Sequence, residues 1–308
     1  WLNASVVEAM RSWFLEVAWA ELEPQLTGRA AGAVPGGEGM PVSGWAGVTE
    51  ATLRRCAAAG LLADNLGDHT LAARILEASL RAAKEEGLGE TEARCLVQSH
   101  LGTLSRHAEP GLPGLERALE HYGEALAVYE RQPGLARGVD YANLVHAKAI
   151  ALRGKAGCCA PADRRAAFAA CLETARAARR VYLDRHQRWS EEYGNLLKTV
   201  GTCYAELGAQ DEALQVLEAA ARTFRHACAA PGEGGSAAPA ALDSEGKEGG
   251  PWHCDTLVEL AKCRARMGER EGARRAFTDA IAGLECLGAT GRPAYSQARE
   301  GLDALGGA

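Results

Sequence analysis

The chain has 308 residues, of which 47% are hydrophobic and 24% are charged. These shares exclude wholesale disorder and supply enough apolar material for a large buried core. The formal net charge of −6 argues against a general nucleic-acid binder, and the sequence has no apolar run of about 18 residues that would predict a membrane span.

The N-terminal segment combines a helical pattern with a glycine-rich stretch. Residues Ser5–Gln25 predict an amphipathic helix, so we expect residues 1–27 to form an N-terminal cap or half repeat, or alternatively a partner site. Residues 28–45 are rich in Gly and Ala and predict a flexible insertion. Because the first residue is Trp1 rather than methionine, we expect further sequence upstream.

A spacing pattern then recurs in three segments, Cys56–Ser79, Leu197–Ala220 and Leu257–Ala280. Small or apolar residues recur at the same offsets, except that Arg264 stands in the third segment where the second has Tyr204. The spacing predicts a first helix, called here the A helix, and a second, called the B helix. A glycine at offset 11 is expected to end the A helix, because it tolerates a left-handed backbone. An alanine at offset 16 is expected where the two helices cross.

Two weaker copies fill the space between the first and second clear ones. One has its A helix near Glu92–Arg106 and its B helix near Pro113–Glu130, joined by a long loop. The other has its A helix near Tyr141–Arg153 and its B helix near Ala162–Asp184, and we expect an insertion at Lys155–Ala160.

The pattern L-x2-[apolar]-[GA]-x2-Y-x3-G-x4-A-x3-[LF]-x2-A resembles the tetratricopeptide repeat (TPR), and the long spacings resemble the kinesin-light-chain-like variety. This resemblance implies an all-α, right-handed superhelical solenoid of about five TPR-like helix pairs over residues 46–288. Residues 229–251 are expected to be a disordered insertion within it, and residues 289–308 a C-terminal capping helix and tail, with the helix at Tyr295–Leu305.

The resemblance also implies a concave groove lined by A helices, which holds extended peptides. Residue-by-residue transfer gives the candidate partner-binding residues Arg54, Asn65, Ser99, Arg106, Asn195, Lys198, Thr202, Lys262 and Arg266. The same alignment adds Ala57, Leu61, Asp64, Leu96, Thr103, His107, Glu206, Asp255 and Val258. Asn can hydrogen-bond a peptide backbone, and Lys or Arg can pair with a carboxylate. The set departs from the carboxylate clamp of chaperone-binding members, so binding to a chaperone C-terminus is not expected.

Catalytic motifs are absent, so we expect neither an enzyme nor a bound cofactor or metal. The ten cysteines lack CxxC spacing and are expected to be reduced in an intracellular, cytoplasmic protein. The adjacent pair Cys158 and Cys159 leaves a redox role open.

Three functions remain open at this point. The first is a non-catalytic adaptor or scaffold that binds protein or peptide segments in the groove. The second is a structural subunit of a large cytoskeletal or ciliary assembly, and the third is an RNA-binding helical repeat. Seven arginines make one helix basic, which indicates a solvated face, an acidic protein partner or RNA: Arg164, Arg165, Arg176, Arg179, Arg180, Arg185 and Arg188. The sequence leaves the oligomeric state open.

Overall fold

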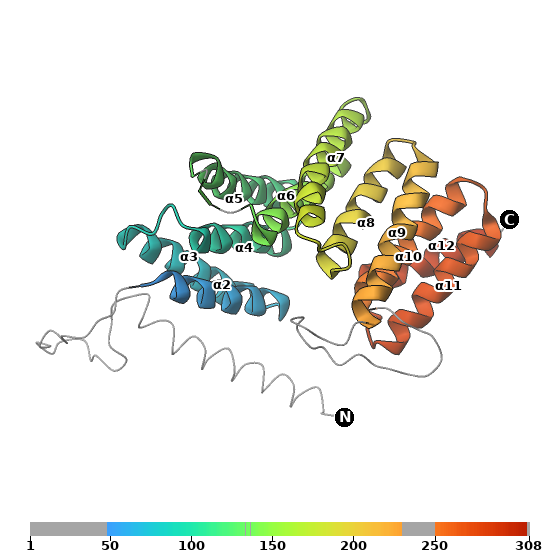
Figure 1. Ribbon diagram of the computed structural model, residues 1–308. Coiled ribbons are helices and arrows are strands. Elements are labelled where there is room, and N and C mark those ends of the chain that lie inside the picture. The colour runs from blue at the N-terminus through green and yellow to red at the C-terminus, as the bar shows by residue number, and fades with distance from the viewer. Residues whose placement is uncertain (1–47, 133, 136, 230–249, 307–308) are drawn as a thin grey trace, which may run out of the picture. The chain divides into compact units, whose positions relative to one another are not determined.

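The computed structural model describes residues 48–132, 134–135, 137–229 and 250–306 (Figure 1). Within these ranges the chain forms α-helices and no strand, so the predicted all-α class is confirmed. The expected N-terminal helix, the stretch at 28–45 and residues 230–249 of the insertion expected at 229–251 lie outside the described residues. The ends of that insertion differ from the prediction, because Ala229 belongs to one helix and Pro251 begins the next. No helix in the described ranges is long and apolar enough to cross a membrane.

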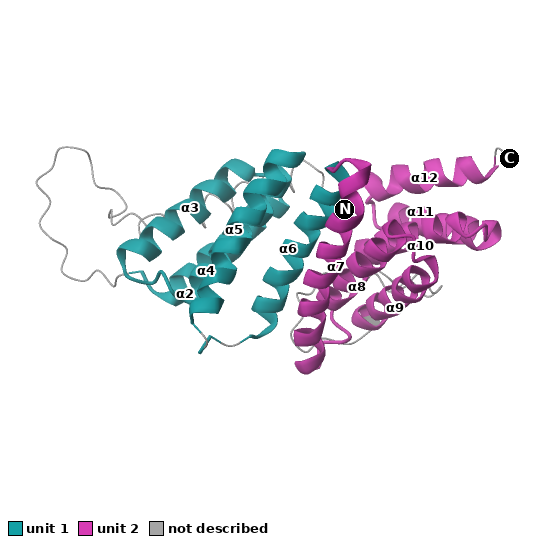
Figure 2. Ribbon diagram, turned by 90° about the horizontal axis from the view of Figure 1, so that it is seen from above, with its two compact units in different colours: residues 1–158 teal, residues 159–308 magenta. Residues whose placement is uncertain are grey.

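The described helices divide between two compact units (Figure 2). Unit 1 contains α2 (Glu50–Asn65), α3 (His69–Glu85), α4 (Glu92–Ala108), α5 (Leu112–Arg131) and α6 (Val139–Cys158). Unit 2 contains α7 (Pro161–Asp184), α8 (Glu191–Glu206), α9 (Gln210–Ala229), α10 (Pro251–Arg266), α11 (Arg270–Cys286) and α12 (Pro293–Gly306). The division falls inside the third predicted pair, because α6 ends unit 1 and α7 begins unit 2.

The helix pairs turn where the glycine spacing predicts. Gly67, Gly208 and Gly268 follow α2, α8 and α10, and their φ angles are 82°, 85° and 81°. This left-handed backbone favours glycine because a Cβ would be strained there. Side-chain caps fix several helix starts, as when Thr49 accepts a hydrogen bond from the backbone N–H of Thr52 at 3.2 Å.

The two helices of a pair approach closely through small residues. Gly60 of α2 lies against Leu76 of α3, and a Cβ at Gly60 would come within 2.6 Å of the leucine side chain. Gly201 makes the same approach to Leu217, the equivalent residue of the α8–α9 pair. The alanines at offset 16 have no exposed surface: Ala72, Ala213 and Ala273. These contacts bury leucine side chains between helices, which stabilises each hairpin.

Two loop predictions were wrong. Helix α6 continues through the expected insertion and ends at Cys158. Its last turn is stabilised by packing on α5, because Ala156 has no exposed surface and Lys155 pairs with Glu116 at 2.9 Å. The loop between α4 and α5 is also shorter than expected, because α4 extends to Ala108 and α5 begins at Leu112.

Candidate functional site

The candidate residues lie in both units, and each unit is described by itself. Arg54, Asn65, Ser99 and Arg106 belong to α2 and α4 of unit 1. Asn195, Lys198, Thr202, Lys262 and Arg266 belong to α8 and α10 of unit 2. In unit 2, α10 contacts both α8 and α12, so these three helices present adjacent side chains. We call this surface the unit 2 A-helix face, defined by Lys198, Trp252, Asp255, Lys262, Arg266 and Arg292.

The centre of the unit 2 A-helix face is Trp252, in the first turn of α10. Its side chain is 43% exposed. The Lys198 ammonium lies 4.8 Å from the ring centroid and the Arg292 guanidinium 5.0 Å from it. Both distances allow cation–π attraction, which holds the exposed ring in one orientation.

Asp255, one turn after Trp252, neutralises the same two cations. The Arg292 guanidinium donates to both carboxylate oxygens, from Nη2 at 2.7 Å and from Nε at 3.4 Å. Lys198 Nζ lies 3.8 Å from Oδ2. The carboxylate therefore joins α8 and α10 to the segment that precedes α12, and the aromatic ring is backed by fixed charges.

Two further contacts tie α10 to its neighbours. Lys262 Nζ donates to Glu259 at 2.8 Å and to Gln297 of α12 at 2.7 Å. Arg266 donates to Glu206 at 2.9 Å and to the backbone oxygen of Ala205 at 3.3 Å, both in α8. These predicted groove residues thus contact groups within the chain, so their charges are already partly matched.

Two of the candidate side chains in α8 are less available to a binding partner than their positions along the helix suggested. The Thr202 hydroxyl donates to the Lys198 carbonyl at 2.9 Å, within its own helix. Asn195 lies two turns before Thr202 and is half-buried. The face is therefore dominated by the tryptophan and the charged side chains.

In unit 1 the equivalent residues form a charged cluster at the helix starts. Arg54 donates to Glu92 at 2.6 Å and lies 3.6 Å from Asp140, so it links α2 to α4 and α6. Hydrogen bonding to Glu92 raises the pKa of the Arg54 guanidinium, which stays protonated. Ser99 is half-buried in α4, and its carbonyl accepts a hydrogen bond from Thr103.

At the other end of these helices lies a buried carboxylate. The side chain of Asp64 is 2% exposed and accepts hydrogen bonds from Nδ1 of His69 at 3.0 Å and Nδ1 of His107 at 2.8 Å. Burial favours a raised pKa for Asp64, but the two histidines outweigh it and the pKa is lowered. Asn65, beside it, is exposed, and Arg106 lies near Tyr122.

Some positions expected in the groove are not on a surface. Ala57 has no exposed surface and Val258 is 1% exposed, so placing them in the groove was wrong. Asp64 is also buried, because its carboxylate turns toward the two histidines rather than outward. The groove residues were assigned from their position along the A helix alone, and this position does not determine the direction in which each side chain points.

Sequence reasoning missed Trp252. Trp252 lies in the first turn of α10, which is before the positions that the repeat alignment marks as lining the groove. The signal that could have found it is a tryptophan directly after Pro251, at a helix start, in a chain with only 6% aromatic residues.

No family model matches this sequence, and no curated protein matches it. Among solved structures, the crystal structure of BtubC (BKLC) from P. vanneervenii, a kinesin light chain-like TPR protein, is similar to the chain. The TM-score is 0.50 and the identity is 15%, over 84% of this chain and 83% of that one. The fold is a TPR-like helical repeat. This confirms the predicted solenoid class, while the low identity limits the likeness to the fold.

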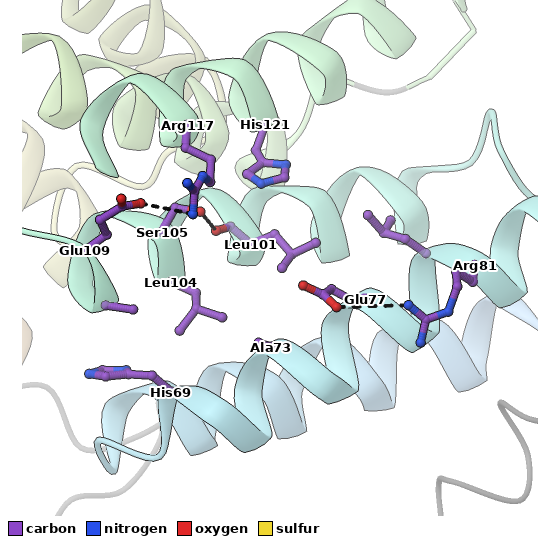
Figure 3. A pocket seen from close by; sticks show the side chains of 12 residues that line it. His69, Ala73, Glu77, Arg81, Leu101, Leu104, Ser105, Glu109, Arg117 and His121 are labelled. Atoms are coloured by element: carbon purple, nitrogen blue, oxygen red, sulfur yellow. Dashed lines mark hydrogen bonds and ion pairs between the residues drawn. The ribbon is translucent and has the colours of Figure 1, made fainter. Parts of the chain in front are cut away.

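A second surface feature lies in unit 1, on the side of the B helices (Figure 3). A hollow of about 670 Å³ opens between α3 and α5 over α4. Leu101 and Leu104 form its floor, and the rim carries two ion pairs, Arg81 with Glu77 at 4.0 Å and Arg117 with Glu109 at 3.0 Å. We call it the α3–α5 hollow.

The basic helix found in the sequence is α7. Its arginines are partly engaged within unit 2: Arg176 donates to the Tyr204 hydroxyl at 3.0 Å, and Arg179 donates to the Tyr193 hydroxyl at 3.3 Å. Five of the seven arginines lie in α7, while Arg185 and Arg188 follow its end, and these contacts give two of the five a structural role. Among the described residues, no group of His, Cys, Asp and Glu is arranged to hold a metal ion.

Proposed function

We propose that the protein is a non-catalytic adaptor that holds protein or peptide segments on the unit 2 A-helix face. The TPR-like fold is typically non-enzymatic and is a fold of adaptor proteins. The observation that carries the proposal is the exposed Trp252, with the Lys198 ammonium 4.8 Å and the Arg292 guanidinium 5.0 Å from its ring centroid. As part of the same proposal, the adaptor acts in the cytoplasm, in association with the cytoskeleton, which the kinesin light chain-like neighbour supports.

The physical reason lies in the cost of binding. A partner gains most from a large side chain that is already ordered, because little conformational entropy is lost on contact. Tryptophan and arginine are the residues most often found to dominate interface energies. Trp252 offers apolar area for burial, and Arg292, whose side chain is 33% exposed, offers N–H groups beside the ring. Lys198 is only 12% exposed, so its part is to hold the ring in place. A short extended peptide could cover the apolar ring with a side chain and accept hydrogen bonds from the N–H groups with its backbone carbonyls.

The test compares partner capture by three forms of the full chain. The face variant carries Trp252→Ala and Lys198→Ala. The matched control carries Trp189→Ala and Arg270→Ala, which also removes an exposed tryptophan and a cation from unit 2. We expect quantitative mass spectrometry to find proteins enriched by the wild type and the control, and depleted about tenfold or more with the face variant. Equal recovery by all three, with unchanged helicity, would contradict the proposal.

A structural subunit of a large cytoskeletal assembly is the second candidate, and the α3–α5 hollow favours it. Its concave shape could receive a side chain of a neighbouring subunit, and its charged rim could fix that subunit's orientation. Reversing Arg81 and Arg117 to Glu should then release the tagged chain from a large complex on size-exclusion chromatography. Release by the face variant instead would favour the adaptor.

A further inference from the structure

Two cysteines far apart in sequence meet inside unit 2. Cys171 lies on α7 and Cys203 on α8, with neither side chain exposed. Their Sγ atoms are 3.2 Å apart, and the structure holds both as thiols. A disulfide needs an S–S distance of about 2.05 Å, so the sulfurs must approach by only about 1.2 Å.

Two other buried cysteines contact backbone carbonyl oxygens. Cys95 Sγ lies 3.5 Å from the carbonyl oxygen of Ala125, and Cys263 Sγ lies 3.5 Å from that of Gln210. Cys158 and Cys159 are neighbours in sequence, and the first is exposed while the second is half-buried. Their Cα atoms are therefore about 3.8 Å apart, which is below the usual range of about 4.4 to 6.8 Å for a disulfide. Cys171 and Cys203 are therefore better placed to form a disulfide than Cys158 and Cys159 are.

We propose that Cys171 and Cys203 form a reversible disulfide that cross-links α7 to α8 when hydrogen peroxide reaches unit 2. One thiolate attacks peroxide, the O–O bond breaks, sulfur gains one oxygen as a sulfenic acid, and the other oxygen leaves as water. The second sulfur then attacks the sulfenic sulfur, the S–S bond forms, and the S–O bond breaks. The two thiol protons leave in the two waters, so two electrons pass from the sulfurs to peroxide. A dithiol reductant reverses the reaction.

Burial controls the first step and proximity controls the second. Peroxide must enter while α7 and α8 separate briefly, so the first oxidation is slow compared with that of an exposed thiolate. Once a sulfenic acid forms, the partner sulfur is within 3.2 Å before any movement. Rapid formation of the disulfide would therefore protect the sulfenic acid from further oxidation to sulfinic acid.

The cross-link would also stabilise unit 2. It joins positions 32 residues apart and so restricts the unfolded chain. We expect the midpoint of thermal unfolding of unit 2 to rise by about 5 to 10 °C on oxidation and to return on reduction. Peroxide would thereby change the stiffness of the α7–α8 contact without changing the surface residues.

The test uses the full chain and trypsin. Reduced protein is treated with hydrogen peroxide, the remaining thiols are alkylated, and the digest is analysed by mass spectrometry without reduction. Cleavage gives peptides 166–176 and 199–222, each with one cysteine. We expect these two peptides linked, at about ten times the abundance of any other cysteine pair, and separated again by dithiothreitol.

Three variants complete the test. Cys203→Ala and Cys203→Ser should both abolish the linked peptide and the rise in the unfolding midpoint. Cys95→Ser changes another buried thiol and should leave both unchanged. The proposal is overturned if Cys171 and Cys203 remain as thiols in the wild type after the oxidation of the exposed Cys158 and Cys286 has gone to completion. This readout needs no variant to fold, and it does not depend on partner binding.

Discussion

Nδ1 of His107 donates a hydrogen bond of 2.8 Å to the buried carboxylate of Asp64, and this bond joins the end of α4 to the end of α2. The second carboxylate oxygen accepts from His69 at the start of α3. One buried charge thereby connects three helices of unit 1, and it does so where the hairpin turns. Its loss would leave two donors without their acceptor.

Replacing this carboxylate should destabilise unit 1. We expect Asp64→Asn to lower the free energy of unfolding by about 2 kcal/mol at pH 7, because charge-assisted hydrogen bonds to a buried group are lost. The pKa of Asp64 is lowered in the fold, so its contribution is present above the unfolded pKa of about 3.9 and disappears as pH falls through the folded value. Urea titrations at pH 7 and pH 3 measure this.

The control for that prediction is the adjacent residue. Asn65 is exposed, so Asn65→Ala should change the free energy of unfolding by no more than about 0.5 kcal/mol at either pH. A cost for Asp64→Asn that is as large at pH 3 as at pH 7 would contradict the role assigned to the ionised carboxylate.

Two other histidines make the fold sensitive to mild acid. Desolvation lowers the pKa of His100 to about 4, and desolvation together with the charge of Arg225 lowers the pKa of His253 to about 4. In the unfolded chain the value is about 6.5, so the unfolded state takes up protons first as pH falls. Stability should therefore decline between about pH 6.5 and pH 4, by about 1 to 2 kcal/mol per histidine at pH 5.

Glutamine at either position removes this proton uptake. Denaturation of His100→Gln and His253→Gln at pH 7.5 and pH 5 should give a smaller difference in unfolding free energy than the wild type gives. An unchanged difference in both variants would mean that these imidazoles do not titrate as their surroundings indicate.

The close approach within the α4–α5 pair can be tested with two glycines. A Cβ at Gly102 would lie 2.5 Å from the ring of Tyr122, which is fully buried. We expect Gly102→Ala to cost about 2 kcal/mol, because neither the helix nor the ring can move without disturbing the core. Gly123 of α5 has open space beside it, so Gly123→Ala should stabilise by about 0.5 to 1 kcal/mol. Thermal unfolding of both variants measures the contrast.

The repeat spacing predicted much of this fold because it reflects constraints that are local in sequence. Gly67, Gly208 and Gly268 stand where a left-handed residue is needed, and Gly60 stands where two helices nearly touch. Such positions tolerate few residue types, so they leave a pattern. Helix α6 departs from prediction because contacts with α5, not its own residues, carry it to Cys158.

The candidate site was less accessible to sequence reasoning. Helix position predicts which residues share a side of an A helix, but Asp64 turns inward to its histidines. Trp252 becomes prominent only because Arg292, forty positions later, lies beside it in space. Contacts between side chains so distant in sequence have no local signature, and they decide which surface is presented.

The most direct test of the proposed adaptor is hydroxyl-radical footprinting of the tagged full chain, alone and in complexes isolated from cells. Trp252 and Trp189 are both exposed in unit 2, at 43% and 50%, so they report on two surfaces in one experiment. If partners bind the unit 2 A-helix face, oxidation of Trp252 falls severalfold in the complex and that of Trp189 does not change. Oxidation of Trp252 at the same rate with and without partners would contradict the account.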